Sequence, residues 1–115
     1  MNNINIFRAN RGEGKTKWLI ERAIDEYENG KTLYYVGSPA TYVSVKNLWE
    51  ATMHSVCPIA PQEYIPKKVH EDCVFFTDEL LLNVNSYIWL SNMLSFSNYT
   101  NLPWYITMDK EDFVN

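Results

Sequence analysis

Two short segments of the chain carry residues whose types and spacing suit phosphate and metal chemistry. The first is Gly-Glu-Gly-Lys-Thr at residues 12–16, and the second is Thr-Asp-Glu at residues 77–79. Glycines let a backbone loop wrap around an anion with its N–H groups pointing inward. Lys15 can reach the outer phosphates of a nucleotide, and the Thr16 hydroxyl can ligate Mg²⁺. The first segment therefore predicts a phosphate-binding loop.

The second segment supplies two adjacent carboxylates. Asp78 can hold Mg²⁺ opposite Thr16, directly or through its waters, and Glu79 can orient and activate an attacking water. The alternatives are a glycine-rich turn capped by a lysine-bearing helix, and a strand that ends in a solvated acidic turn. Both segments follow predicted strands, where parallel sheets bind their ligands. Their joint occurrence favours a site for a metal-bound triphosphate.

The elements that must position these residues alternate along the chain. Strands are predicted at residues 4–7, 31–36, 73–77 and 104–107, and helices at 15–28, from 38 to near 54, and at 85–99. Apolar residues recur at helical spacing, Asn29-Gly30 provides a helix stop, and Ser38-Pro39 provides a helix start. This alternation predicts a single α/β domain over residues 1–115, with a parallel sheet and helices on both faces.

In these motifs the chain resembles the P-loop NTPase superfamily, in particular the division with an added strand and a catalytic glutamate. The resemblance implies a three-layer αβα sandwich with a four-stranded parallel sheet in the order 1-4-3-2. Residues 33–36 would form the added strand. Glu79 would be the catalytic glutamate, and Thr107 the polar residue that senses the γ-phosphate. The implied ligands are ATP and Mg²⁺, with the metal held by Thr16 and Asp78.

The phosphate loop is also similar to those of phage DNA-packaging ATPases, the motor part of large terminases. Their loops often carry an arginine three residues before the last glycine and often lack the first glycine, and Arg11 and Ala9 match both features. In that family the arginine can act in cis on the γ-phosphate, as an arginine finger does. Alternatively, Arg11 is a solvated loop residue. The residues expected to bind nucleotide are Asn10, Arg11, Gly12, Glu13, Gly14, Lys15, Thr16 and Lys17, and those expected in catalysis are Lys15, Glu79, Arg11 and Thr107.

The resemblance implies Mg-dependent ATP hydrolysis by a small phage-type ATPase, coupled to DNA processing or packaging. Two other functions stay open. One is a small-molecule kinase similar to the thymidine kinases, which would transfer the γ-phosphate to a nucleoside. The other is a nucleotide-binding regulatory protein with little turnover.

All His and Cys residues of the chain form two matching pairs. His54 precedes Cys57, and His70 precedes Cys73, with two residues inside each pair and twelve between the pairs. This spacing is typical of structural zinc sites. The alternative is that Cys73 opens a buried strand as a small hydrophobe, while Cys57 lies in an ordinary loop.

Composition limits the expected partners and location. The formal net charge of −4 gives no general attraction to nucleic acid or anionic membranes, so DNA binding is a weak prediction. We find no apolar stretch of membrane-spanning length and no signal-peptide pattern, so we expect a cytoplasmic protein, in the host cytoplasm if it is of phage origin. The strand at residues 4–7 is expected near an open sheet edge, which favours a homo-oligomer or a protein partner.

Overall fold

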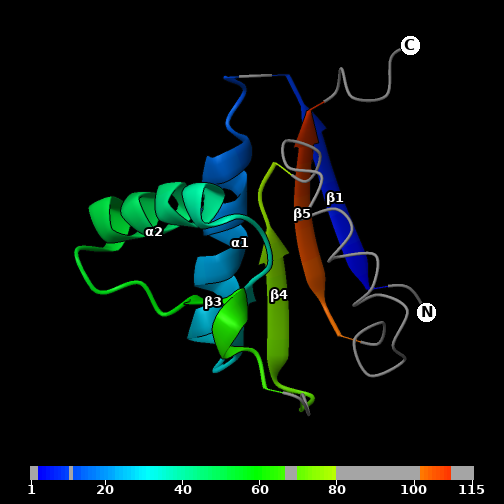
Figure 1. Cartoon of the computed structure of the whole chain (residues 1–115), viewed down its shortest axis with the longest axis vertical. Coiled ribbons are helices and arrows are strands. Elements are labelled where there is room, and N and C mark those ends of the chain that lie inside the picture. Colours follow the sequence, from blue (N-terminus) through cyan, green and yellow to red (C-terminus); the bar gives the residue numbers. More distant parts are fainter. Residues whose placement is uncertain (1–2, 11, 67–69, 80–101, 110–115) are drawn as a thin grey trace.

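The computed structural model describes residues 3–10, 12–66, 70–79 and 102–109. The predicted helix at residues 85–99 lies outside these ranges. None of the described helices has the length and apolar character needed to cross a membrane. The described elements are β1 (Ile4–Ala9), α1 (Lys15–Glu28), β2 (Thr32–Tyr35), α2 (Pro39–Met53), β3 (Ala60–Pro61), the 3-10 helix η1 (Gln62–Tyr64), β4 (Cys73–Thr77) and β5 (Trp104–Asp109) (Figure 1).

The strands form a parallel sheet in the order β1-β5-β4-β2-β3. The α/β class with a parallel sheet is confirmed. The observed sheet differs from the predicted four-stranded sheet in the order 1-4-3-2, because β3 adds a fifth strand at the edge beside β2; the four predicted strands follow one another as β1-β5-β4-β2. Strand β3 has two residues, Ala60 and Pro61. A proline-rich connection has no alternating pattern, and proline offers no N–H to a ladder, so the sequence predicts a loop there.

Both described helices cover the same face of the sheet (Figure 1). The connections from β1 to β2 and from β2 to β3 move across the sheet in one direction, so right-handed crossovers place α1 and α2 on one side. Their core contains Leu19 and Ala23 from α1, Trp49 from α2, and Val74 and Phe76 from β4. A second helical layer, which the predicted sandwich requires, falls on residues that the structure does not describe.

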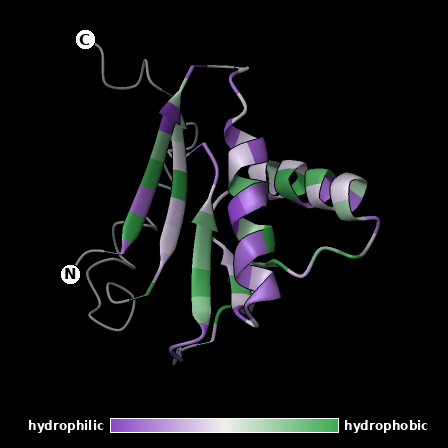
Figure 2. Ribbon diagram, turned by 180° about the vertical axis from the view of Figure 1, so that it is seen from behind, coloured by the Kyte–Doolittle hydropathy of each residue, from purple (hydrophilic) through white to green (hydrophobic). Residues whose placement is uncertain are grey.

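Strand β4 is buried along its whole length, and Figure 2 shows its hydrophobic character. Val74 and Phe76 face the helices, whereas Cys73 and Phe75 belong to a second core cluster on the other face of the sheet. There the rings of Phe75 and Trp104 stack with centroids 4.7 Å apart. Because β4 is packed on both faces, the acidic turn that follows it starts from a well-supported strand end.

Candidate functional site

The loop between β1 and α1 turns on two glycines. Gly12 and Gly14 both have φ of +83°, a left-handed conformation that side chains disfavour. The loop is closed by a backbone bond from the Glu13 N–H to the Asn10 carbonyl at 3.1 Å and by a 2.5 Å bond from the Asn10 N–H to the Glu13 carboxylate. Gly14 is the N-cap of α1 and makes no side-chain cap. The first turn of a helix with such a cap offers backbone N–H groups to an anion.

Lys15 begins α1 and points into the site. It is only 4% exposed, and its ammonium lies 2.5 Å from Asp109 and 3.4 Å from both the Glu79 carboxylate and the Asn10 carbonyl. Burial lowers the pKa of Lys15, but the hydrogen bond with Asp109 and the negative charges of Glu79 and Asp109 outweigh it, so the net shift is upward. The ammonium is therefore charged and held by carboxylates.

Thr16 and Asp78 meet across the site. The Thr16 hydroxyl donates to one Asp78 carboxylate oxygen at 2.8 Å, and the Thr107 hydroxyl donates to the other. The Thr107 oxygen also accepts the Glu79 N–H at 2.9 Å. Asp78 is 3% exposed and Thr107 is fully buried. In this structure the Thr107 hydroxyl therefore holds the two acids, and its predicted role as a γ-phosphate sensor stays a prediction.

Glu79 follows β4 in a left-handed conformation with φ of +56°. Its side chain is 25% exposed. Burial raises the pKa of the Glu79 carboxyl, and the charges of Asp109 and Asp78 add to this; Lys15 acts in the opposite direction without reversing it. A carboxylate with a raised pKa binds a proton more readily than an ordinary exposed one, which suits a general base.

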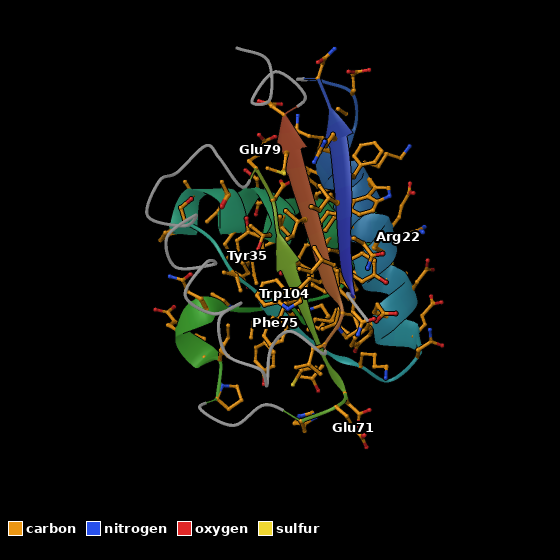
Figure 3. The ribbon with its side chains drawn as sticks, turned by 90° about the vertical axis from the view of Figure 1, so that its right-hand side faces the viewer. Arg22, Tyr35, Glu71, Phe75, Glu79 and Trp104 are labelled. Carbon is orange, nitrogen blue, oxygen red and sulfur yellow. The ribbon has the colours of Figure 1, made fainter. Side chains whose placement is uncertain are left out.

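A cavity of about 370 Å³ at the carboxyl end of the strands is bordered by Thr16 and by the three acids Asp78, Glu79 and Asp109. Figure 3 shows Glu79 at this end of the sheet, with Glu71 at the opposite end. The N-terminal turns of α2 form part of the cavity wall. The lining residues are Thr16, Ala40, Thr41, Ser44, Asp78, Glu79 and Asp109.

The structure brings together several of the residues that the sequence singled out. Five of them lie within hydrogen-bond or ion-pair distance of one another at one end of the sheet: Lys15, Thr16, Asp78, Glu79 and Thr107. The side chains of Asn10, Glu13 and Lys17 are exposed at the loop and the start of α1. Arg11 lies outside the described residues.

Sequence reasoning missed Asp109. The predicted strand ended at residue 107, but β5 pairs with β1 as far as Asp109. Residues 107 and 109 lie on the same side of a strand because side chains alternate. An acid two residues beyond the predicted Thr107 site was the available signal.

The proposed zinc site is not supported. Cys73 is buried in the core cluster with Phe75, whereas Cys57 packs against the cluster beneath the helices, on the other face of the sheet. His54 and His70 are both exposed. Within the described part of the chain, no group of three or more His, Cys, Asp or Glu residues could hold a metal ion. The cysteines therefore act as core residues, because the intervening sheet separates them.

Magnesium needs fewer protein ligands than a structural zinc ion does. It is usually held by one or two protein oxygen ligands together with waters and substrate phosphates. The Thr16 hydroxyl and the Asp78 carboxylate, 2.8 Å apart beside the cavity, provide such a pair of hard oxygen ligands. The residues present thus fit Mg²⁺ bound together with a phosphate ligand.

Comparison with protein-family models, with curated proteins and with solved structures gives no match for this chain.

Proposed function

We propose that this chain binds ATP with Mg²⁺ and hydrolyses it, as a small P-loop ATPase. The observation that supports this most directly is the 2.8 Å hydrogen bond between Thr16 and Asp78. These residues are 62 positions apart in the chain. They stand beside a buried lysine ammonium at the mouth of a glycine loop, where a triphosphate and its metal would need them.

Each group has a distinct role in this proposal. The glycine loop and the start of α1 bind the phosphates through backbone N–H groups, and Lys15 neutralises their charge. Thr16 and Asp78 would hold Mg²⁺, which supplies further neutralisation of the phosphate oxygens when bound.

Glu79 orients a water molecule and accepts its proton. The water oxygen forms a bond to the γ-phosphorus, the bond from that phosphorus to the bridging oxygen breaks, and ADP leaves. The raised pKa of Glu79 favours this proton transfer. Its carboxylate lies 3.4 Å from the Lys15 ammonium, within reach of the bound phosphate.

Nucleotide binding is tested with Lys15→Ala. We expect wild-type protein to bind ATP in isothermal titration calorimetry, and Lys15→Ala to bind at least about tenfold more weakly, since a charge-assisted hydrogen bond is worth about 1.5–3 kcal/mol. Lys46→Ala is the matched control because Lys46 also pairs with a carboxylate, Glu50 at 3.3 Å, but lies on α2 and does not line the cavity. Equal binding by all three proteins would refute the assignment.

Hydrolysis is tested with Glu79→Gln. Phosphate release should be lost while ATP binding is retained, because the amide keeps the shape but is a very poor proton acceptor. Glu71→Gln, at the opposite end of the sheet, is the control and should match wild type (Figure 3). Wild-type turnover in Glu79→Gln would show that this carboxylate is not the base. Transfer of phosphate to a nucleoside in the same assay would instead identify a kinase.

Coupling to DNA and self-association belong to the same proposal. β1 is terminal in the described strand order, which supports pairing with another chain at that edge. We expect sedimentation to detect an oligomer at raised concentration, and single- or double-stranded DNA to stimulate turnover. A strict monomer would exclude self-association, and turnover that is insensitive to DNA would exclude coupling to DNA. Neither result would contradict the ATPase assignment.

A further inference from the structure

The acidic turn after β4 is held from both sides by side-chain hydroxyls. The Asp78 N–H donates to the Tyr35 hydroxyl at 3.2 Å, and the Glu79 N–H donates to the Thr107 hydroxyl at 2.9 Å. Tyr35 ends β2, and Thr107 lies on β5. β4 lies between these two strands. Just beyond its end, side-chain hydroxyls of the neighbouring strands therefore accept the backbone N–H groups that would otherwise bond to a strand backbone.

This turn needs such support. Glu79 is a non-glycine residue with φ of +56°, which costs free energy for a residue with a Cβ. A conformation of this kind persists when surrounding contacts determine it. The two hydroxyl bonds lock the adjacent backbone groups, and the conformation in turn directs the Glu79 carboxylate to within 3.4 Å of Lys15.

Tyr35 also connects the turn to helix α2. Its buried hydroxyl donates to the Thr41 hydroxyl at 2.7 Å, and Thr41 lines the cavity. Burial raises the pKa of Tyr35, so its phenol keeps the proton that this bond uses. Gly37 makes room for the ring, because a Cβ there would lie 2.7 Å from a Tyr35 ring carbon. Figure 3 shows Tyr35 below Glu79.

We propose that Tyr35 is a positioning residue for ATP hydrolysis: its hydroxyl fixes the Asp78–Glu79 turn and couples that turn to Thr41 on the cavity wall. The role rests on the proposed function for its catalytic consequence. Tyr35 itself does not touch the phosphate; it acts through the acids.

The direct test compares Tyr35→Phe with Tyr42→Phe. Both variants remove one hydroxyl and keep the ring, but the Tyr42 hydroxyl bonds the Ile59 carbonyl at 2.7 Å, outside the acidic turn. We expect Tyr35→Phe to lower kcat about tenfold or more, since small misplacements of a catalytic group are costly, while the Kd for ATP changes less than about twofold. Tyr42→Phe should stay within about twofold of wild type in both quantities. Equal kcat in the two variants would overturn the proposal.

Amide hydrogen exchange provides a readout that needs no turnover. The Asp78 and Glu79 amides should be protected in wild type and in Tyr42→Phe, and lose protection about tenfold or more in Tyr35→Phe, because the hydrogen-bonded turn opens more often. Unchanged protection would overturn the positioning role even if wild type hydrolyses ATP. If wild-type protein does not hydrolyse ATP, only the proposed function is refuted. The exchange result would still show whether the Tyr35 hydroxyl fixes the Asp78–Glu79 turn.

If Tyr35→Phe does not fold, Thr41→Val is the variant that tests the same coupling. It removes the acceptor of the Tyr35 hydroxyl on the partly exposed wall and leaves the buried ring in place. A lower kcat with reduced protection at Asp78 supports the coupling, whereas wild-type kcat and protection refute it.

Discussion

Asp109→Asn is the perturbation that most sharply separates a nucleotide site from a purely structural ion pair. The Lys15 ammonium lies 2.5 Å from Asp109, and the exposed fractions of the two side chains are 3% and 31%. A triphosphate in the loop requires the same ammonium. Asp109 therefore competes with phosphate for Lys15, and its charge repels the incoming ligand. We expect Asp109→Asn to bind ATP more tightly and to be less stable when empty.

The magnitude follows from the contact. A hydrogen bond between charged groups contributes about 1.5–3 kcal/mol net. Asp109 is partly solvated, so we reduce this to about 1–2 kcal/mol. At about 1.4 kcal/mol per factor of ten, nucleotide affinity should rise about 5- to 30-fold. The free energy of unfolding of the nucleotide-free protein should fall by a similar amount, because the variant keeps an acceptor for Lys15 but loses the charge.

The assay is calorimetric titration with ATP, with and without Mg²⁺, together with urea denaturation of the empty protein. Asp72→Asn is the matched control, because Asp72 changes the net charge equally and pairs with Lys31 at 3.6 Å while being 62% exposed. It should leave affinity within about twofold, as surface pairs contribute little. If Asp109→Asn binds ATP no more tightly than wild type, or if both variants tighten binding equally, Asp109 does not compete with phosphate for Lys15.

Four further outcomes are expected. Gly37→Ala places a Cβ 2.7 Å from the Tyr35 ring and should lower the free energy of unfolding by about 1–3 kcal/mol in urea denaturation. Gly14→Ala meets no atom within 4 Å but must adopt φ of +83°, so it should lose about 1–2 kcal/mol of stability and weaken ATP binding; unchanged binding would exclude this loop as the phosphate site. Because the pKa of Glu79 is raised above its ordinary value of 4.5, kcat/KM should rise with pH through a value above 4.5, and a profile flat there would exclude Glu79 as the base. Because the pKa of Lys15 is raised above 10.5, its contribution to stability is complete below pH 10.5 and is lost as pH rises through the higher folded-state pKa; Lys15→Met should flatten that alkaline loss in melting temperature.

Local patterns were sufficient to predict the elements on which the site is built. Residues 15–28 form the predicted helix, and residues 73–77 form the predicted buried strand. The glycine loop precedes the former and the acid pair follows the latter. These predictions succeeded because helix periodicity, strand hydrophobicity and turn residues act over a few neighbouring positions. Residues that directly follow parallel strands then lie together at the carboxyl edge of the sheet.

The sequence could not predict relations between distant segments. Strand β3 was not predicted, because it has only two residues and one of them is proline. It is a strand through its pairing with the edge of β2. The matched spacing of Cys57 and Cys73 indicated a zinc site, yet the sheet places these residues in separate cores. Spacing along the chain does not report which face of a sheet a residue occupies when a long connection intervenes.

The site itself shows the same division. The sequence alone singled out Lys15 and the acid pair as candidates, because each belongs to a short motif with its own chemistry. Only the tertiary structure brought Asp109 to the lysine and the Tyr35 hydroxyl to the Asp78 amide. Those contacts depend on how far β5 pairs with β1 and on β2 lying beside β4. Strand pairing is decided by the packing of the whole sheet, and no local stretch of residues encodes it.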